Sequence, residues 1–423
     1  ILFENSGIER GDKIALCGRN SSHWAVAFLA TLTYGAIAVP VQNEFTPEQI
    51  HNIVNHSESK LLFVGDVVCT QVNPDMMPAL EGIVYLPDFS IVISRSEQLT
   101  FAREHLNEIF GKRYPKYFRK EHISYYKEQS PEELAMINYT SGTTGFSKGV
   151  MLPYRALWGN IDYVLKCLAP NVKPGSNLVS ILPMAHMYGL AVEFLFGFIN
   201  GCHLYFLNRM PSPSLIAEAF AEVKPRLIVA VPLVIEKIIR RKVLAEVQTN
   251  RMKLLLNMPV INKKIKQHIR DRIMEAFGGN AFEIIVGGAP LNQGIEEFLN
   301  SVGVPVTIGY GTTETAPLIT FANYDKYKIA SCGPVVDHME AKVVSPDPAN
   351  VPGELIAKGM NVMLGYYKNE EATNAVIDKD GWFHTGDLAT MEPSGHIYIK
   401  GRIKNKLLGA NGQNVYPEEI EDK

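Results

Sequence analysis

The 423-residue chain carries a formal net charge of −3, with 46% hydrophobic and 20% charged residues. Its length exceeds what one hydrophobic core supports, so two or more packed units are expected. Because the chain has no excess of basic residues to neutralise phosphates, its composition argues against a nucleic-acid partner.

The cysteines and the most apolar stretch define the expected setting. Five widely spaced cysteines without a CxxC pair argue against a zinc site or a disulfide framework and indicate a reducing, cytoplasmic environment. The most apolar stretch, residues 180–207, is interrupted by Pro183, His186 and Glu193, so it lacks the run of about 18 apolar residues that a membrane span needs. We predict a buried helix between two strands there. Peripheral membrane contact and oligomeric state stay open.

The first part of the chain alternates strand and helix patterns. KIALCG (13–18), AIAVPVQ (36–42) and LLFVG (61–65) are predicted strands. HWAVAFLATLTYG (23–35) and TPEQIHNIVNHSES (46–59) are predicted helices, the second with Thr46 as its N-cap. This βαβαβ order predicts a largely parallel, doubly wound sheet.

A second set of apolar runs follows, at 177–183, 202–208, 225–232 and 281–288, with Pro232 at the start of a predicted helix. After about Asp337 the sequence pattern changes to short alternating strands separated by Gly, Pro and Asp turns. This pattern is typical of a small antiparallel unit. Residues 404–423 look like the opening of another domain. The fold class expected is therefore α/β, with two doubly wound sheets and a small antiparallel β unit, followed by the start of a small α+β domain.

The glycine- and hydroxyl-rich stretch INYTSGTTGFSKGVML (137–152) carries the first functional signal. It is not a P-loop, because Ser147 rather than glycine precedes Lys148. It matches GxSxG around Ser147, but a predicted strand rather than a helix follows, so a hydrolase nucleophile elbow is rejected. What remains is a turn between two strands whose backbone N–H groups, hydroxyls and Lys148 can bind phosphate oxygens. The alternative without a functional role is that this stretch is a flexible linker.

YTSGTTGFSKGV strongly resembles the phosphate loop of the adenylate-forming (AMP-binding) superfamily, which includes acyl-CoA synthetases, aryl-CoA ligases, luciferases and peptide-synthetase adenylation domains. Other segments resemble its motifs in the same order: PMAHMYG (183–189), GGAPL (287–291), GYGTTET (309–315), TGD (385–387), GR (401–402) and ANGQNVYPEEIE (410–421), with Gly412 at the glycine position of the last. Ser147 stands where proline is usual. The resemblance implies an N-terminal domain over 1–403, with 337–403 a β-rich subdomain, and a C-terminal domain that begins at 404–423.

The resemblance also implies a site for ATP and AMP. The β- and γ-phosphates would be held by Thr140, Ser141, Gly142, Thr143, Thr144, Gly145 and Lys148. Gly287, Gly288, Ala289 and Pro290 would lie along adenine, Tyr310 would offer its aromatic face between Gly309 and Gly311, and Asp387 and Arg402 would bind ribose. Thr313, next to Thr312, would contact the α-phosphate and Glu314 would bind Mg²⁺; Lys148, His186, Thr313 and Glu314 are the expected catalytic residues.

Each expected site residue has a structural alternative. His186 and Tyr310 could be ordinary core residues, Glu314 and Asp387 solvated surface acids, and Arg402 half of a surface ion pair. Met184 and Met187 are expected to line a pocket or fill the core. The segments are nevertheless expected to converge on one nucleotide.

The family's expected chemistry has two half-reactions: ATP activates a carboxylic acid to an acyl-adenylate with release of pyrophosphate, and coenzyme A then displaces AMP. The family's hinge position corresponds to Lys404, and its adenylation lysine would lie beyond Lys423. We therefore expect the sequence to be a fragment that binds ATP or AMP but adenylates slowly.

LIVAVPLVIEKI (227–238) resembles a segment of medium- and long-chain fatty acyl-CoA synthetases, with Leu233 replacing an arginine, and a fatty acid is the expected substrate. Two alternatives stay open. One is a ligase for aryl acids or for acids such as o-succinylbenzoate, and the other is an acyl-adenylate-forming or nucleotide-binding protein that does not use coenzyme A.

Overall fold

The computed structural model describes residues 1–122, 130–140, 148–207, 209–240, 259–403, 407–408 and 414–415, except for the side chains of 259–262 and of the last two pairs. Ser141, Gly142, Thr143, Thr144 and Gly145 lie outside the described residues, as do Ser147, Lys404 and Gly412. The chain divides into two compact units, which are described separately. The first unit comprises Ile1–Arg155, Pro183–Met187 and Met363–Glu370, and the second comprises Ala156–Leu182, Tyr188–Val362 and Glu371–Lys423.

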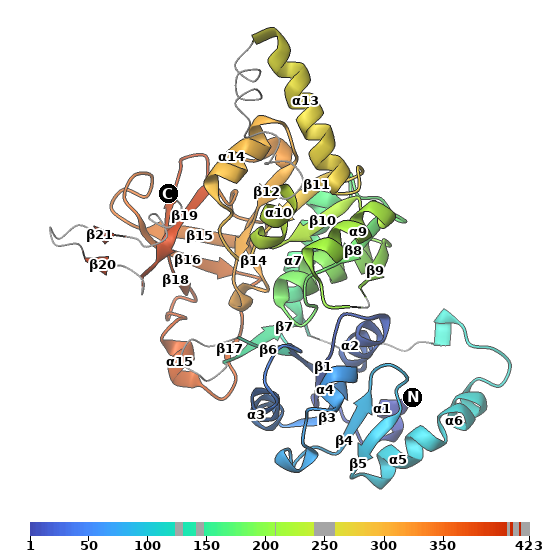
Figure 1. Ribbon diagram of the computed structural model, residues 1–423. Helices are drawn as coiled ribbons and strands as arrows, with labels where there is room; N and C mark the ends of the chain where they lie inside the picture. The colour runs from blue at the N-terminus through green and yellow to red at the C-terminus, as the bar shows by residue number, and fades with distance from the viewer. Residues whose placement is uncertain are drawn as a thin grey trace. The chain divides into compact units, whose positions relative to one another are not determined.

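The first unit is built on an eight-stranded sheet in the order β17-β7-β6-β2-β1-β3-β4-β5 (Figure 1). Pairing is parallel from β6 to β4, whereas β7, β17 and β5 are antiparallel to their neighbours. The described elements are α1 Leu2–Asn5, β1 Lys13–Cys17, α2 Ser22–Tyr34, β2 Ile37–Val41, α3 Pro47–Ser57, β3 Ser59–Val64, α4 Asp66–Cys69, η1 Pro74–Met76, β4 Gly82–Tyr85, β5 Ile91–Ser94, α5 Glu97–Glu104, α6 Leu106–Arg113, η2 Lys120–His122, β6 Leu134–Tyr139, β7 Gly149–Pro153 and β17 Gly365–Tyr366.

Local sequence signals set the helix ends of this unit. The Ser21 side chain accepts a hydrogen bond from the Trp24 N–H at the start of α2, and Gly35 ends that helix at φ 85°. Thr46 and Gln49 form a capping box at the start of α3, as expected for Thr46. The central strands β1 and β2 are almost wholly buried, because a parallel sheet is covered on both faces.

The second unit holds a parallel five-stranded sheet in the order β12-β11-β10-β8-β9 and an antiparallel four-stranded sheet, β15-β16-β18-β19. Its elements, with α7 and α15 given in full, are α7 Tyr154–Leu168, β8 Asn177–Ser180, the π-helix η3 Gly189–Leu195, α8 Phe196–Ile199, β9 His203–Phe206, α9 Pro213–Val223, β10 Leu227–Ala230, α10 Pro232–Ile239, α13 Pro259–Ala276, β11 Glu283–Val286, α14 Gln293–Ser301, β12 Val306–Ile308, β13 Tyr310–Gly311, η5 Thr313–Thr315, β14 Leu318–Thr320, η6 Tyr324–Lys326, β15 Met339–Val344, β16 Gly353–Gly359, α15 Glu370–Asn374, β18 Phe383–Met391, β19 Ile397–Arg402, β20 Leu407–Leu408 and β21 Asn414–Val415.

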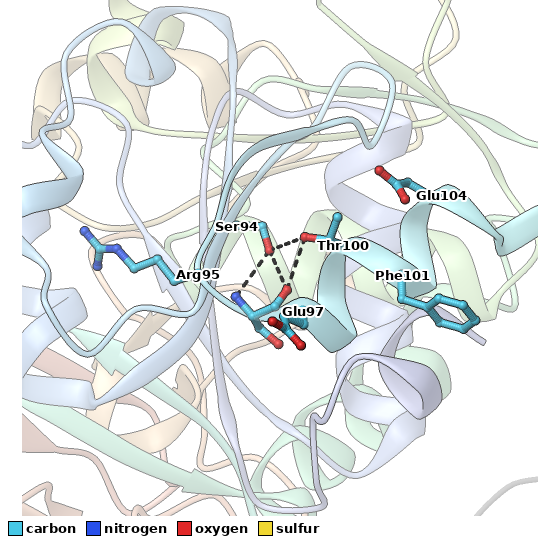
Figure 2. A pocket seen from close by; sticks show the side chains of 7 residues that line it. Ser94, Arg95, Glu97, Thr100, Phe101 and Glu104 are labelled. Atoms are coloured by element: carbon cyan, nitrogen blue, oxygen red, sulfur yellow. Dashed lines mark hydrogen bonds between the residues drawn. The ribbon is translucent and has the colours of Figure 1, made fainter.

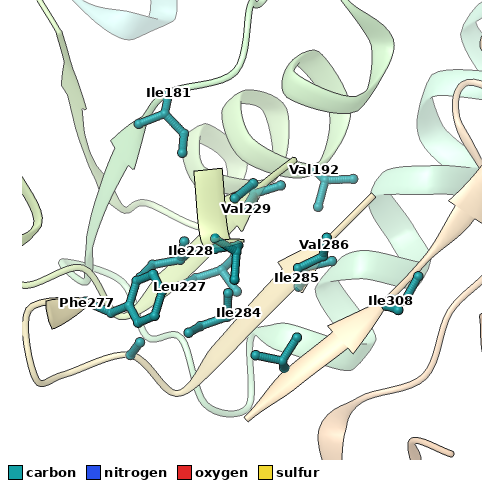
Figure 3. Close-up of a cluster of buried hydrophobic side chains, with 14 of the residues drawn as sticks. Ile181, Val192, Leu227, Ile228, Val229, Phe277, Ile284, Ile285, Val286 and Ile308 are labelled. Atoms are coloured by element: carbon teal, nitrogen blue, oxygen red, sulfur yellow. The ribbon is translucent and has the colours of Figure 1, made fainter. Parts of the chain in front are cut away.

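The core of the second unit lies around its parallel sheet. Figure 3 shows Leu227 to Val229 of β10 and Ile284 to Val286 of β11 meeting Phe277, Val192 and Ile308. These runs of β-branched and other apolar residues read as short buried strands in the sequence, and they form the centre of the sheet.

The expected α/β class is confirmed, with two sheets rich in parallel pairing and a small antiparallel sheet. The predicted helix between two strands within 180–207 is also confirmed, as η3 and α8 between β8 and β9. Among the described residues, no helix combines the length and apolar character that crossing a membrane requires.

Candidate functional site

In the first unit, the strand pair β6–β7 positions the phosphate-loop candidates. Tyr139 faces Gly149 in the register, and the Thr140 N–H donates to the Lys148 carbonyl over 3.1 Å. The strand β7 follows the loop, which confirms that a nucleophile elbow around Ser147 lacks its helix. The structure therefore describes the two ends of the turn, Thr140 and Lys148.

Glycine is required at the exit of this turn. A Cβ at Gly149 would lie 2.9 Å from Cγ2 of Ile137 and 3.0 Å from the Tyr139 ring. The Gly149 carbonyl also accepts a hydrogen bond from the Tyr367 N–H over 2.7 Å. This close packing fixes the direction in which the chain leaves Lys148.

Lys148 lies over an aromatic ring that sequence reasoning missed. Its exposed side chain places Nζ 4.7 Å from the centroid of the buried Tyr366 ring. Tyr366 belongs to β17, which pairs with β7 so that Tyr366 faces Val150. A cation–π contact of this kind limits the positions of an otherwise flexible ammonium group.

The segment PMAHM also belongs to the first unit, where two asparagines bind its backbone. The buried Asn138 side chain donates to the Ala185 carbonyl over 2.9 Å, and the Met184 N–H donates to Asn20 Oδ1 over 2.8 Å. Met184 is buried, whereas His186 is exposed. The Asn138 bond fixes the backbone next to His186 near the end of β6, and desolvation lowers the pKa of the His186 ring.

In the second unit, the carboxyl ends of β11 and β12 bring two glycine-rich segments together. The Gly309 N–H donates to the Val286 carbonyl over 3.1 Å. Gly287 is buried, and a Cβ there would lie 3.0 Å from the Tyr188 ring, while Gly288, with a φ of 83°, begins the exposed stretch that continues through Ala289 and Pro290. Ligands of open α/β sheets bind at this carboxyl edge.

The segment 309–315 runs through the short strand β13 into the 3-10 helix η5. A Cβ at Gly311 would lie 1.7 Å from the Pro317 carbonyl oxygen, so only glycine fits there. The Thr312 N–H donates to Thr315 Oγ1 over 3.1 Å at the start of η5, which carries Thr313 and Glu314. The half-buried side chains of Thr313 and Glu314 are therefore held on one short turn.

Two buried asparagine side chains form hydrogen bonds with the backbone of this turn and of β14, which follows it. Asn160 of α7 accepts from the Leu318 N–H over 2.8 Å and donates to the Thr315 carbonyl over 3.2 Å. Asn361 donates to the Leu318 carbonyl over 2.9 Å. The sequence gives no sign of either role, because both contacts are made between residues far apart in the chain.

Tyr310, Asp387 and Arg402 form a hydrogen-bonded cluster in the second unit. The Tyr310 hydroxyl donates to Asp387 Oδ2 over 2.5 Å, and Arg402 Nε lies 3.0 Å from Asp387 Oδ1. The side chain of Asp387 is only 6% exposed and that of Arg402 is 66% exposed. Asp387 is therefore not a solvated surface acid, whereas Arg402 does form an ion pair, with another expected site residue.

Burial determines the titration of this cluster. Desolvation raises the pKa of Asp387, the hydrogen bond from Tyr310 and the charge of Arg402 oppose that rise, and the negative charge of Glu314 adds to it. Burial and the neighbouring Asp387 raise the pKa of Tyr310 well above its usual range. Glu314 is thus close enough to Asp387 for their charges to interact, and a bound cation would relieve that repulsion.

The chemistry of these residues fits Mg²⁺ held mainly by a substrate. Within the described part of the chain, no group of three or more His, Cys, Asp or Glu side chains could form a metal site by itself. Mg²⁺ commonly binds to one or two carboxylates together with substrate phosphates, so a single half-buried Glu314 is a suitable donor.

A buried carboxylate of the second unit, Glu193, binds the backbone at the end of β8. Glu193 of η3 is 1% exposed and accepts hydrogen bonds from the Ser180 hydroxyl, the Ile181 N–H and the Leu182 N–H, at 2.9, 3.0 and 3.3 Å. Burial raises the pKa of Glu193 to about 8. It holds the end of β8 and the backbone that leads to Pro183, a role that its sequence context did not reveal.

A surface depression of the first unit lies away from these residues. It is lined by residues around the start of α5, among them Ser94, Arg95 and Thr100 (Figure 2). It adjoins β5, at the opposite end of the first unit's sheet from β6 and β7. We do not assign the nucleotide to this depression, because none of the expected nucleotide-binding residues lines it.

Comparisons with known proteins agree on the family. The family described as AMP-binding enzyme matches residues 2–367. A long-chain-fatty-acid–CoA ligase of Escherichia coli O6:H1 is 31% identical over 445 residues, covering 100% of this chain and 73% of that protein. The crystal structure of ATP-bound MatB from Rhodopseudomonas palustris is 26% identical with a TM-score of 0.74, covering 99% of this chain and 74% of that one.

One further structure shares the fold. The o-succinylbenzoate CoA synthetase (MenE) of Bacillus subtilis, in complex with its acyl-adenylate intermediate, has a TM-score of 0.73 at 21% identity, over 100% of this chain and 74% of that one. At this identity the likeness concerns architecture and leaves the acid undetermined.

Proposed function

This chain belongs to the AMP-binding enzyme family, and on that premise we propose that it is an AMP-forming acid–CoA ligase acting on a medium- or long-chain fatty acid. The acid would first react with ATP to give an acyl-adenylate and pyrophosphate. The thiol of coenzyme A would then attack the acyl carbon, forming a thioester and releasing AMP. The observation that best supports nucleotide binding is the cluster of Tyr310, Asp387 and Arg402 next to Glu314.

In this proposal the second unit binds the nucleoside and the α-phosphate. Each Asp387 oxygen accepts one hydrogen bond within the protein and has a further lone pair for a ribose hydroxyl. The hydrogen bond from the Tyr310 hydroxyl to Asp387 fixes the Tyr310 ring in an orientation for stacking on adenine. Gly287 to Pro290 provide backbone along the base, and Thr313 donates to the α-phosphate.

Charge neutralisation is the main catalytic demand, since a carboxylate must approach a polyphosphate. We assign the β- and γ-phosphates to Thr140, the turn 141–147 and Lys148, whose contact with Tyr366 orients the ammonium group. Mg²⁺ bound at Glu314 would supply additional positive charge. His186 would lie at the carboxylate-binding end. In-line attack by the acid on the α-phosphorus expels pyrophosphate, so holding both reactants lowers the entropic barrier.

The fatty-acid assignment draws on the Escherichia coli relative, which aligns with the whole chain. It also draws on the apolar segments 227–238 and 190–199. A cytoplasmic, reducing setting is part of the proposal and agrees with the free thiols of all five cysteines.

The nucleotide site is tested by calorimetric titration with AMP and ATP–Mg²⁺. Asp387→Asn should weaken AMP binding by about 10- to 100-fold, because a charged acceptor is lost. Asp380→Asn, at an exposed acid of the same unit, is the matched control. Equal affinity of the wild-type protein and Asp387→Asn would remove Asp387 from the site.

The acid is tested with a panel of octanoate, palmitate, benzoate and o-succinylbenzoate, each with ATP, Mg²⁺ and coenzyme A. Thioester formation with the fatty acids alone supports the proposal. Activity with the aryl acids alone would replace it by the aryl-ligase alternative, and adenylate without thioester would indicate a protein that does not use coenzyme A.

A further inference from the structure

An exposed aromatic and basic segment, residues 110–120, lies at one edge of the first unit. It comprises the end of α6 and the residues that follow, and α5 and α6 come directly after the edge strand β5 (Figure 1). Phe110, Tyr117 and Phe118 are 41%, 54% and 48% exposed, and Phe101 on the neighbouring α5 is 53% exposed. Phe101 projects from α5 beside Glu104 in Figure 2. Large apolar rings grouped in this way on a surface indicate an interaction site.

The rings form an ordered cluster. Phe110 packs against Tyr114 at 5.1 Å and Phe118 at 5.7 Å between ring centroids, and Tyr114 packs against Phe118 at 5.0 Å. The His122 ring stacks on Tyr114 at 5.1 Å. Even after this mutual packing, the exposed fractions of Phe110 and Phe118 stay near one half, so the cluster presents a preformed apolar surface.

Basic side chains surround these rings. Residues 112–120 contain Lys112, Arg113, Lys116, Arg119 and Lys120 and no acidic residue, whereas the chain as a whole has a net charge of −3. Lys112 pairs with Glu108 and Arg113 with Glu4. Arg119 stacks on the Tyr117 ring at 4.1 Å.

Three basic side chains of the segment are exposed and can bind an external anion. Lys116, Arg119 and Lys120 are exposed and form no ion pair with another residue in the part of the chain that the structure describes. Glu121 directly follows them in the sequence, and Glu97 and Glu104 line the depression beside Phe101. Residues 110–120 therefore carry a positive formal charge on a chain that is negative overall.

We propose that residues 110–120, together with Phe101, dock this protein on an anionic lipid bilayer. Aromatic rings enter the boundary between head groups and acyl chains, while flanking lysine and arginine side chains bind anionic head groups. The phenyl rings of Phe101, Phe110 and Phe118 have no hydrogen-bonding group, and this favours a lipid over a polar macromolecule. The inference depends on this surface alone and not on the assignment of the acid.

The docking surface and the nucleotide-site candidates of the first unit lie at opposite ends of one sheet. β5 ends the strand order at one side, and β6, β7 and β17 end it at the other. Variants of residues 110–120 should therefore leave AMP affinity unchanged, which provides an internal check that the variant protein is folded.

The test is co-sedimentation with vesicles of phosphatidylcholine alone and of phosphatidylcholine with 30% phosphatidylglycerol. Wild-type protein should bind the anionic vesicles and lose binding as NaCl rises, because salt screens the attraction. Lys116→Glu/Arg119→Glu/Lys120→Glu should weaken partitioning by about 100-fold. Lys173→Glu/Lys263→Glu/Lys379→Glu changes the net charge equally at exposed sites of the second unit and should bind like the wild type.

A second variant separates the apolar contribution. Phe101→Ser/Phe118→Ser should weaken binding at high salt more than at low salt, since electrostatic attraction is retained. The proposal is overturned if wild-type protein does not bind anionic vesicles, or if both triple variants lose binding equally. Tighter binding to a single-stranded oligonucleotide than to the vesicles, abolished by the same triple variant, would identify a nucleic-acid surface instead.

Discussion

Replacing Glu193 with glutamine should remove a pH dependence from the stability of this protein. The folded carboxyl has a pKa of about 8, and its ordinary value is 4.5. Between these values the folded state retains a proton that the unfolded state releases, so the wild-type protein loses stability as pH rises. Each pH unit in this window costs up to about 1.4 kcal/mol. The free energy of unfolding should therefore fall by on the order of 4 kcal/mol between pH 5 and 8 through this group.

Glutamine reproduces the protonated carboxyl. Its Oε1 can accept from the Ile181 N–H and its Nε2 can donate to the Ser180 hydroxyl, but Nε2 cannot accept from the Leu182 N–H, as Glu193 Oε2 does over 3.3 Å. Glu193→Gln should consequently be somewhat less stable than the wild type near pH 5, because the Leu182 N–H loses its acceptor, and should gain on the wild type steadily toward pH 9.

The assay is urea denaturation followed by far-UV circular dichroism at each pH unit from 5 to 9. Glu222→Gln, at an exposed position of α9, is the control and should follow the wild type throughout. The reasoning is refuted if the difference between Glu193→Gln and the wild type is constant across this range, since Glu193 would then be ionised, or neutral, in both states alike.

Asn160→Leu should lower the free energy of unfolding by about 2–4 kcal/mol, because the Leu318 N–H and the Thr315 carbonyl lose their buried partner; denaturation and AMP titration of the same sample measure both effects, and unchanged AMP affinity would separate this asparagine from the site. Gly311→Ala should abolish AMP binding, since a Cβ would lie 1.7 Å from a carbonyl oxygen; binding at wild-type affinity would contradict the described turn. Burial lowers the pKa of His51, so the unfolded state takes up more protons and stability should fall as pH drops below about 6.5. His51→Gln should flatten this fall in pH-dependent denaturation, and an unchanged slope would assign it to other groups.

The elements whose signals are local were predictable from the sequence. Thr46 and Pro232 mark helix starts because an N-cap hydroxyl and a fixed proline φ act within one turn. The short apolar runs of β10 and β11 identify buried strands by composition alone. Likewise, the strand after Lys148 was evident from its apolar residues.

The supports of the candidate site were not predictable, because they depend on tertiary contacts. Asn160 looks like an ordinary helix residue until Leu318 and Thr315 are placed beside it. Tyr366 reaches Lys148 only through the pairing of β17 with β7. The resemblance to a family located the segments, while the hydrogen bonds that hold Asp387 required the fold.

The pairing of β17 with β7 has a consequence for biosynthesis. Val150 leaves the ribosome long before Tyr366, its partner in the register. At 5–20 residues per second, translation leaves the outer edge of β7 without that neighbour for about 10–40 s. An unpaired edge strand is a template for aggregation, so the nascent chain should depend on a chaperone most strongly during this interval.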